Sequence, residues 1–271
     1  MQRYEKIAFF IIFALKGLIQ MAPLFSIITI CYNAASDLQR TIDSVDSQSC
    51  GLYEHIIIDG ASTDGTPAVL SSAARDPRRV IVSEPDNGIY DAMNKGVGRA
   101  KGDYLIFMTA GDRFHNNNTL EIYADKIMAN DYPGIVYGQT ILVDSDGVKV
   151  GERHLRAPVN LSLNSFSNGM SVCHQAMAVL RRIAPLYDVS YRFSADYEWC
   201  IRCLQHSRRN VYIDDVVCDY LSEGVTTANR RASLIERFRI MCHYYGTMPT
   251  VMRHIRFAFR FMRYNHQKNN K

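Results

Sequence analysis

Polar side chains collect at the ends of four apolar runs in the first half of this 271-residue chain. Carboxylates at such positions can accept hydrogen bonds from a base or a ribose, and an aromatic ring can cover the face of a base. These residue types therefore point to a nucleotide as the ligand. The four runs end, in chain order, in Cys31–Asn33, Asp59–Thr66, Glu84–Gly88 and Thr109–Asp112.

The phosphates of such a nucleotide need a neutralising group. No glycine-rich phosphate loop follows the first run, and the sequence contains no GxGxxG. A divalent cation held by Asp112 and completed by phosphate oxygens would serve instead, and Mg²⁺ or Mn²⁺ suits oxygen ligands. Asp112 could also be an ordinary turn residue after a strand, and that alternative stays open.

The four runs must lie side by side for their ends to meet. They are short, apolar and rich in β-branched residues, which is typical of parallel strands buried on both faces. They begin 29, 25 and 24 residues apart, which leaves room for one crossover helix in each gap. We therefore expect an open α/β sheet with its ligand at the strand ends. The expected strands are Phe25–Ile30, Glu54–Ile58, Arg79–Val82 and Asp103–Met108.

After Asn130 the pattern changes. A hairpin is predicted over Ile135–Arg153, around a turn at Asp144–Gly147. A helix is predicted from Ser194 to Gln205, with Ser194 as its N-cap and Asp196 in its first turn. Two further strands are expected at Ala176–Leu180 and Val211–Val217, and the stretch Ala157–Ser171 is irregular.

The net charge of +4 is unevenly distributed along the chain. Positions 237–271 contain eight Lys/Arg and no acid, so positions 1–236 hold 31 − 8 = 23 basic residues against 27 acidic ones. This disfavours a nucleic-acid-binding protein and favours a local basic anchor. Arg253, Arg256, Arg260 and Arg263 share one helical face beside an apolar stripe, which predicts a helix lying on an anionic membrane surface. A helix docked on the domain with a solvated basic face is the alternative.

The N-terminal segment is apolar from Ile7 to Leu15, which is too short to cross a bilayer. A surface helix, or translation starting at Met21, explains it better than a secretion signal. The seven cysteines are an odd number without framework spacing, which indicates a reducing compartment. Cys200 and Cys203 form a CxxC, for which core packing is favoured over metal or redox chemistry.

Four blocks carry a family resemblance through their order and spacing. They are Tyr32-Asn33, Asp59-Gly60 through Thr66, Asp86 through Gly96, and Ala110-Gly111-Asp112. Together they resemble the inverting glycosyltransferases of family 2, which have the GT-A fold. The GIYDAMNKG block resembles the subgroup of colanic-acid and capsular-polysaccharide transferases. The resemblance extends over about residues 24–230 and implies transfer of a sugar from a nucleotide donor, most simply a UDP-sugar, to a lipid-linked or growing polysaccharide.

This resemblance implies roles for residues on the donor side. Asp112, beside Gly111, matches the last Asp of the family's DxD motif and would bind Mn²⁺ or Mg²⁺. Ala110 replaces the first Asp of that motif, which implies fewer protein carboxylates on the ion. Asp59 would contact the base, Asp86 would lie near the ribose, and Ile30, Tyr32 and Asn33 would frame the base. Asp91 and Asn94 could meet the donor sugar or its ribose, and Lys95 could face phosphate or simply be solvated.

The acceptor side would come from the second half. His174-Gln175 and Ala195-Asp196-Tyr197 resemble the HQ and ADY elements of the same subgroup. Inversion needs one carboxylate to take the proton of the acceptor hydroxyl, and Asp196 is the candidate for that base. A first-turn acid stabilised by the helix dipole is its alternative, and Glu198 should point elsewhere. His174 could bind diphosphate, orient the acceptor or be a core histidine.

These expectations divide the chain into an apolar extension (1–23), a GT-A domain (24–236) and a basic tail (237–271), at the cytoplasmic face of the cell membrane. Two alternative functions remain open. A sugar nucleotidyltransferase should carry a glycine-rich loop with a basic residue after the first strand, and Cys31–Ala34 is not such a loop. A non-catalytic membrane scaffold that binds nucleotide sugars is kept open by Ala110.

Overall fold

The computed structural model describes residues 22–222 and 230–256 of the chain. The apolar run Ile7–Leu15 lies outside these ranges, and so do Arg260 and Arg263 of the predicted basic helix. Across the described ranges, no helix combines the length and the apolar character that a bilayer span requires.

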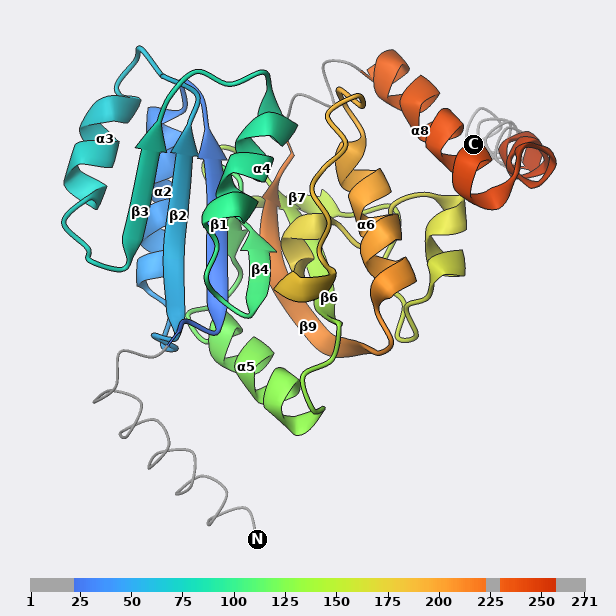
Figure 1. The fold of residues 1–271 in the computed structure, drawn as a ribbon, viewed down its shortest axis with the longest axis horizontal. Helices are drawn as coiled ribbons and strands as arrows, with labels where there is room; N and C mark the ends of the chain where they lie inside the picture. Colours follow the sequence, from blue (N-terminus) through green and yellow to red (C-terminus); the bar gives the residue numbers. More distant parts are fainter. Residues whose placement is uncertain (1–21, 223–229, 257–271) are drawn as a thin grey trace, which may run out of the picture.

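The N-terminal half alternates strands and helices as predicted (Figure 1). The four strands are parallel and lie in the order β3-β2-β1-β4, so that their carboxyl ends meet at one edge of the sheet. Every residue of β1 and β2 is buried, as the apolar runs indicate. The elements are β1 (Phe25–Cys31), α2 (Ala35–Asp46), β2 (Tyr53–Asp59), α3 (Thr66–Ala73), β3 (Arg79–Ser83), α4 (Ile89–Arg99) and β4 (Tyr104–Phe107).

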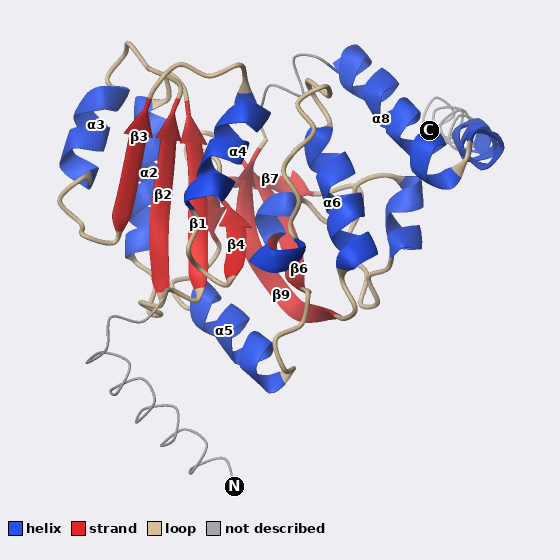
Figure 2. Cartoon of the chain, in the orientation of Figure 1, coloured by secondary structure: helices blue, strands red, loops and turns tan. Residues whose placement is uncertain are grey.

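The second half extends the same sheet to nine strands within the described ranges (Figure 2). The predicted hairpin is confirmed as β6 (Ile135–Val143) and β7 (Lys149–Glu152), paired antiparallel. The predicted strands are confirmed as β8 (Met177–Leu180) and β9 (Asn210–Leu221), which runs parallel to β6. Sequence reasoning missed the two-residue strand β5 (Arg113–Phe114) and the helix α5 (Thr119–Ala129).

The second half of the chain also contains helices. The predicted helix is confirmed as α6 (Ala195–His206), and α8 (Arg230–Tyr245) lies beside it (Figure 1). Residues 247–256 are also helical. The domain boundary expected after position 236 therefore falls inside α8. Three short 3₁₀ turns complete the half: η1 (Leu163–Asn168), η2 (His174–Ala176) and η3 (Arg181–Ile183).

Hydrogen bonds fasten α8 to the start of α6. The carboxylate of Glu236 accepts from the backbone N–H groups of Arg192 and Phe193, at 2.9 and 2.8 Å. Ser194 occupies the N-cap position of α6, as predicted, although its side chain makes no capping bond. Its hydroxyl instead contacts the carbonyl and the hydroxyl of Ser233 on α8.

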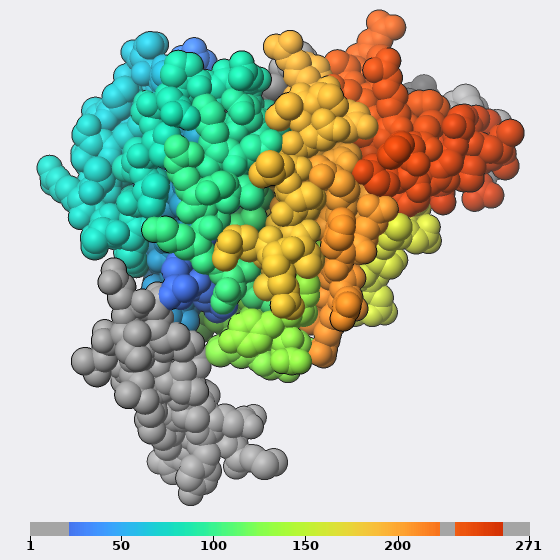
Figure 3. All heavy atoms as spheres, viewed as in Figure 1, coloured from blue at the N-terminus to red at the C-terminus, as the bar shows by residue number. Residues whose placement is uncertain are grey.

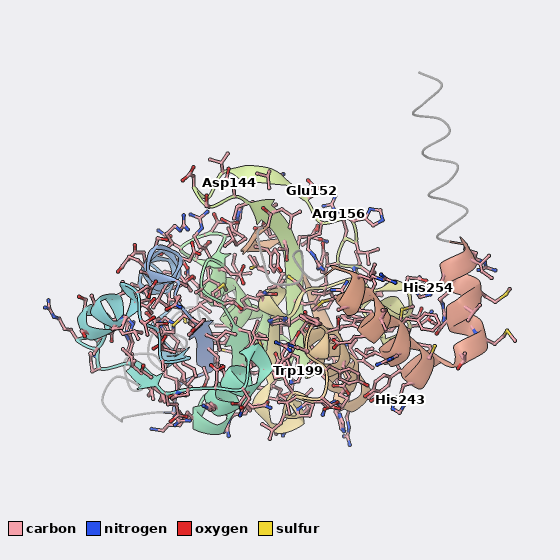
Figure 4. All side chains as sticks on the ribbon, turned by 90° about the horizontal axis from the view of Figure 1, so that it is seen from above. Asp144, Glu152, Arg156, Trp199, His243 and His254 are labelled. Atoms are coloured by element: carbon pink, nitrogen blue, oxygen red, sulfur yellow. The ribbon has the colours of Figure 1, made fainter. Side chains whose placement is uncertain are left out.

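An aromatic stack joins the two halves in the core. The rings of Tyr187 and Trp199 are nearly parallel, with centroids 5.1 Å apart, and Tyr90 of α4 stacks on Tyr187 at 5.6 Å. The indole Nε1 of Trp199, labelled in Figure 4, donates to the carbonyl of Pro185 at 2.7 Å. Stacked rings of this size contribute strongly to core stability. The cysteines are free thiols, and Cys200 and Cys203 are fully buried in α6, where the CxxC packs as expected.

Candidate active site

Asp59 is the last residue of β2, and its side chain points into the protein interior. Its side chain is fully buried, and its Oδ2 accepts from the backbone N–H of Ser62 at 3.1 Å and from the hydroxyl of Ser83 at 2.6 Å. Its Oδ1 accepts from the hydroxyl of Ser62. Both oxygens thus brace the loop after β2 against the end of β3. The thiol of Cys31 also donates to Oδ1, at 3.7 Å, so a contact between Asp59 and a base would require one of these bonds to be exchanged.

Asp86 reaches over the same strand end. A Cβ on Gly60 would lie 2.7 Å from Asp86 Oδ2 and 3.2 Å from the ring of Tyr32, so the glycine makes room for both side chains. Asp86 Oδ1 accepts from the N–H of Gly88 at 2.8 Å, which fixes the carboxylate. Tyr32 is 64% exposed. An exposed ring beside a carboxylate can stack on a base and accept its N–H group.

Ile30 and Asn33, also predicted to frame the base, have structural contacts at the end of β1. Ile30 is buried within β1. Asn33 has a φ of 49°, and its side-chain oxygen accepts from the N–H of Thr63 at 2.9 Å. Its own N–H donates to the hydroxyl of Ser62 at 2.8 Å. Asn33 therefore holds the loops after β1 and β2 together beside Tyr32.

The predicted residues on α4 also bind protein groups. The amide of Asn94 bonds to both backbone groups of Tyr187, accepting at 2.7 Å and donating at 2.9 Å. Lys95 Nζ donates to the carbonyl of Pro85 at 2.7 Å and lies 3.1 Å from a carboxylate oxygen of Glu84. Asp91 accepts from the N–H of Asn87 at 2.9 Å. The contacts of Lys95 and Asp91 hold the loop that carries Asp86, whereas Asn94 joins α4 to the backbone of Tyr187.

Asp112 lies between β4 and β5, directly before β5, and is 3% exposed. Its Oδ1 accepts from the N–H of Leu221 and its Oδ2 from the side chain of Gln175, both at 3.0 Å. Gly111 next to it has a φ of +100°, and a Cβ there would lie 2.5 Å from the side chain of Leu221. This backbone conformation favours glycine. The positive φ turns the chain so that Asp112 faces β9 and η2.

The surroundings of Asp112 bear on the predicted cation. No group of three or more His, Cys, Asp or Glu residues that could hold a metal ion occurs in the described part of the chain. Burial raises the pKa of Asp112 to about 7, although its hydrogen bonds and the nearby His174 counteract this. A desolvated carboxylate of this kind is stabilised by a cation, and each oxygen keeps a lone pair beyond its one hydrogen bond. Asp112 therefore fits an ion that is completed by phosphate and water oxygens.

The 3₁₀ turn η2 lies between the two predicted functional carboxylates. Gln175 donates to Asp112, while Nδ1 of the adjacent His174 lies 3.7 Å from Oδ2 of Asp196. That distance is too long for a hydrogen bond but suits an ion pair when the imidazole is protonated. Both ring nitrogens of His174 are buried, and they have no hydrogen-bond partner among the described residues. Buried polar atoms without a protein partner usually bind a ligand, an ion or a water molecule.

Asp196 lies at the start of α6, within hydrogen-bond distance of Tyr90. Its side chain is 18% exposed, and its Oδ1 accepts from the hydroxyl of Tyr90 at 3.2 Å. Burial raises the pKa of Asp196, but His174 and the charge of Arg237 outweigh burial, so that the pKa is lowered overall. The carboxylate is therefore ionised at neutral pH. Glu198 points elsewhere, as predicted: it pairs with Arg202 and accepts from Tyr244.

Sequence reasoning missed three residues of this site. Tyr90 and Gln175 lie inside the motif blocks, but their types alone do not reveal that they contact Asp196 and Asp112. Arg237 lies on α8, 41 positions after Asp196, and no local pattern connects the two. Only the packing of α8 on α6 brings Arg237 into the site.

Comparisons with known proteins show which sequences this chain resembles. The model of the family described as "Glycosyl transferase family 2" matches residues 26–184, a range that ends before Asp196. A "PGL/p-HBAD biosynthesis glycosyltransferase" of Mycobacterium bovis is 34% identical to this chain over 210 residues, which is 75% of this chain and 78% of the relative.

Solved structures show a similar fold. TarS of S. aureus (residues 1–349) superposes with a TM-score of 0.68 at 15% identity, covering 86% of this chain and 72% of TarS. Another crystal structure of TarS contains UDP-GlcNAc. The mannosyltransferase PcManGT of Pyrobaculum calidifontis, solved with GDP-Man and Mn²⁺, has a TM-score of 0.58 at 16% identity, covering 88% of this chain and 76% of PcManGT. At these identities the likeness concerns the fold alone.

Proposed function

Since the chain belongs to glycosyl transferase family 2 and has the predicted GT-A type of α/β fold, we propose that it is an inverting, metal-dependent enzyme of cell-surface glycan synthesis. It moves a sugar from a nucleoside diphosphate donor, first of all a UDP-sugar, to a lipid-linked or growing glycan. The observation that carries this proposal is the turn η2, whose adjacent residues His174 and Gln175 face Asp196 and Asp112.

On the donor side, the exposed ring of Tyr32 stacks on the base while the carboxylate of Asp86 accepts an N–H group from it. Asp59 and Asn33 hold the loops that present these two side chains. Asp112 would hold Mn²⁺ or Mg²⁺, and such an ion would supply the positive charge that neutralises the diphosphate of the donor and of the leaving group. PcManGT, which shares the fold, was solved in complex with GDP-Man and Mn²⁺, and this supports a metal-dependent donor site.

On the acceptor side, Asp196 takes the proton of the attacking hydroxyl. The freed oxygen forms a bond to the anomeric carbon from the face opposite the leaving group. The bond between that carbon and the phosphate oxygen breaks, and the nucleoside diphosphate departs with its electron pair. Tyr90 fixes the orientation of the carboxylate, and its raised pKa, caused by burial, keeps the phenol a donor.

The test measures which products are released. The full chain is incubated with UDP-, GDP- and dTDP-sugars, with Mn²⁺ or Mg²⁺, and with a lipid-linked glycan acceptor. We expect release of nucleoside diphosphate together with an extended glycan, and no release without the divalent ion. Release of pyrophosphate from a sugar phosphate and a nucleoside triphosphate would identify a nucleotidyltransferase instead. Binding of donors without turnover in any combination would identify a scaffold.

The C-terminal helices also support a peripheral position on an anionic membrane. Five large apolar side chains on α8 and residues 247–256 are each 46% to 73% exposed. Figure 3 shows this region as a protruding end of the molecule. Apolar residues beside arginines suit the interface between lipid headgroups and acyl chains. The five are Leu234, Ile235, Met248, Met252 and Ile255.

Replacing two of these residues should weaken membrane binding. The double change Met248→Gln and Met252→Gln is expected to lower binding to anionic liposomes by about tenfold, because two apolar side chains no longer enter the interface. Co-sedimentation at low salt measures this. The matched control, Val148→Gln with Val150→Gln, changes two exposed residues of the β6–β7 hairpin, which Figure 4 shows well apart from the helices that carry His243 and His254. If the two double variants bound liposomes equally, the proposal that these apolar residues contact the membrane would be wrong.

A further inference from the structure

Two arginines of the C-terminal helices have buried N–H groups without a partner. Nε of Arg237 and Nη1 of Arg253 are inaccessible to solvent and have no hydrogen-bond partner among the described residues. A guanidinium group keeps its charge at any physiological pH, so leaving its donors buried and unpaired is costly. Such groups in a folded protein call for a missing ion, water or ligand.

Arg237 lies on the face of α8 that packs against the domain. Ser233, one turn before it, is buried against Ser194, and Met241, one turn after it, is 4% exposed. Residues four apart share a helix face, so Arg237 extends toward the beginning of α6, where Asp196 lies. The carboxylate of Glu236 is already bonded to two backbone N–H groups and does not neutralise the arginine.

Arg253 approaches the same region from residues 247–256. Its guanidinium carbon lies 5.9 Å from the centre of the Tyr245 ring. The hydroxyl of Tyr245 donates to the carbonyl of Leu163, and the hydroxyl of Tyr197 donates to the carbonyl of Phe166, so that both phenols end on η1. The charges of both arginines also lower the pKa that burial raises on Tyr197. The charges of both guanidinium groups therefore reach the phenol of Tyr197, whose hydroxyl ends on η1.

We propose that Arg237 and Arg253 form an oxyanion subsite that holds a phosphate group of the acceptor beside the proposed base Asp196. The inference rests on the proposed transferase function and specifies its acceptor as a phosphorylated one. Guanidinium groups match phosphate oxygens with paired N–H donors, and two of them from separate helices suit a diphosphate. Met252, on the same helix as Arg253, is exposed, so this helix also carries apolar surface that the tail of a lipid diphosphate can contact.

Binding measured without turnover tests the subsite. Equilibrium dialysis of the full chain with farnesyl diphosphate, at saturating UDP and Mn²⁺ so that the donor pocket is filled, gives the affinity. The variants are Arg237→Gln and Arg253→Gln. The matched controls, Arg239→Gln and Arg256→Gln, change exposed arginines on the same two helices. Farnesol serves as the probe without phosphate, and inorganic pyrophosphate as the competitor without lipid.

We expect Arg237→Gln and Arg253→Gln each to lower the affinity for farnesyl diphosphate by at least about tenfold. The two control variants should change this affinity by less than about twofold, and the affinity for farnesol should not change in any variant. Pyrophosphate should compete, because the arginines hold the phosphates rather than the lipid. Equal losses in all four variants, failure of pyrophosphate to compete, or no binding of farnesyl diphosphate at saturating UDP would overturn the subsite. Thermal unfolding of each variant checks folding. Because no sugar is transferred, the result is independent of whether the donor experiment succeeds.

Discussion

Replacing Asp196 by Asn should lower the rate of sugar transfer by at least about a hundredfold while leaving the affinity for the donor nucleotide unchanged. The amide oxygen of Asn can still accept from the hydroxyl of Tyr90, so the side chain keeps its place. It cannot take a proton from the acceptor hydroxyl. The loss should therefore appear in kcat, as measured by nucleoside diphosphate release at saturating donor and acceptor.

Glu198→Gln is the matched control for this change. Glu198 is an acid on the same helix, but its partners are Arg202 and Tyr244 rather than groups of the site. Transfer per folded molecule should stay within about threefold of that of the unaltered chain, since no transition-state contact is removed. If Asp196→Asn transferred sugar as fast as Glu198→Gln, then Asp196 would be a first-turn helix acid and the base would lie elsewhere.

Replacing Asp112 by Asn should abolish the response to divalent ions. Asn has the shape of Asp, and a turned amide of Gln175 can supply the acceptor that the new NH₂ group needs, so the bonds to β9 and η2 can persist. What disappears is the charge that would hold the ion. Turnover should fall by at least about a hundredfold, because electrostatic stabilisation of the leaving diphosphate is lost. Calorimetric titration with UDP should then give the same affinity with and without Mn²⁺.

Asp64→Asn is the matched control, because it removes a different carboxylate that also follows a strand. Asp64 also follows a strand, but its oxygens accept from the N–H groups of Thr66 and Ala35 within the loop framework. Its replacement should leave the gain in UDP affinity on adding Mn²⁺ unchanged. A variant Asp112→Asn that kept this gain would show that Asp112 is the ordinary turn residue that the sequence also allows.

The sheet could be predicted because its strands leave a strong local signature. β1 and β2 are buried along their whole length, so most positions are apolar, and the crossover helices fix the spacing between strands. β5 has two residues and forms only through its pairing with β9, so it leaves no signature of its own. Ser194 is the N-cap of α6, as predicted, but its hydroxyl contacts Ser233 of α8, and a partner so distant in sequence leaves no local signal.

The sequence predicts which carboxylates belong to the candidate site, but not which groups their oxygen atoms contact. Asp59 and Asp86 look equivalent in the sequence, since both follow strands and both precede turn residues. The structure distinguishes them, because Ser62 and Ser83 bond to Asp59 whereas Gly60 leaves space for Asp86. Asn94 likewise looks like a ligand residue until the backbone of Tyr187 is seen to satisfy its amide. Such distinctions depend on neighbours from other elements.

The stack around Trp199 has a practical consequence in spectroscopy. Trp199 is the one tryptophan of the whole chain, and it lies one helical turn after Asp196 with its indole against Tyr187. Intrinsic emission excited at the red edge of the ultraviolet band therefore comes from a single buried fluorophore beside the proposed base. Its wavelength and quenching by iodide report whether α6 stays seated on the sheet. Every substitution proposed for this region thus carries its own label-free optical control.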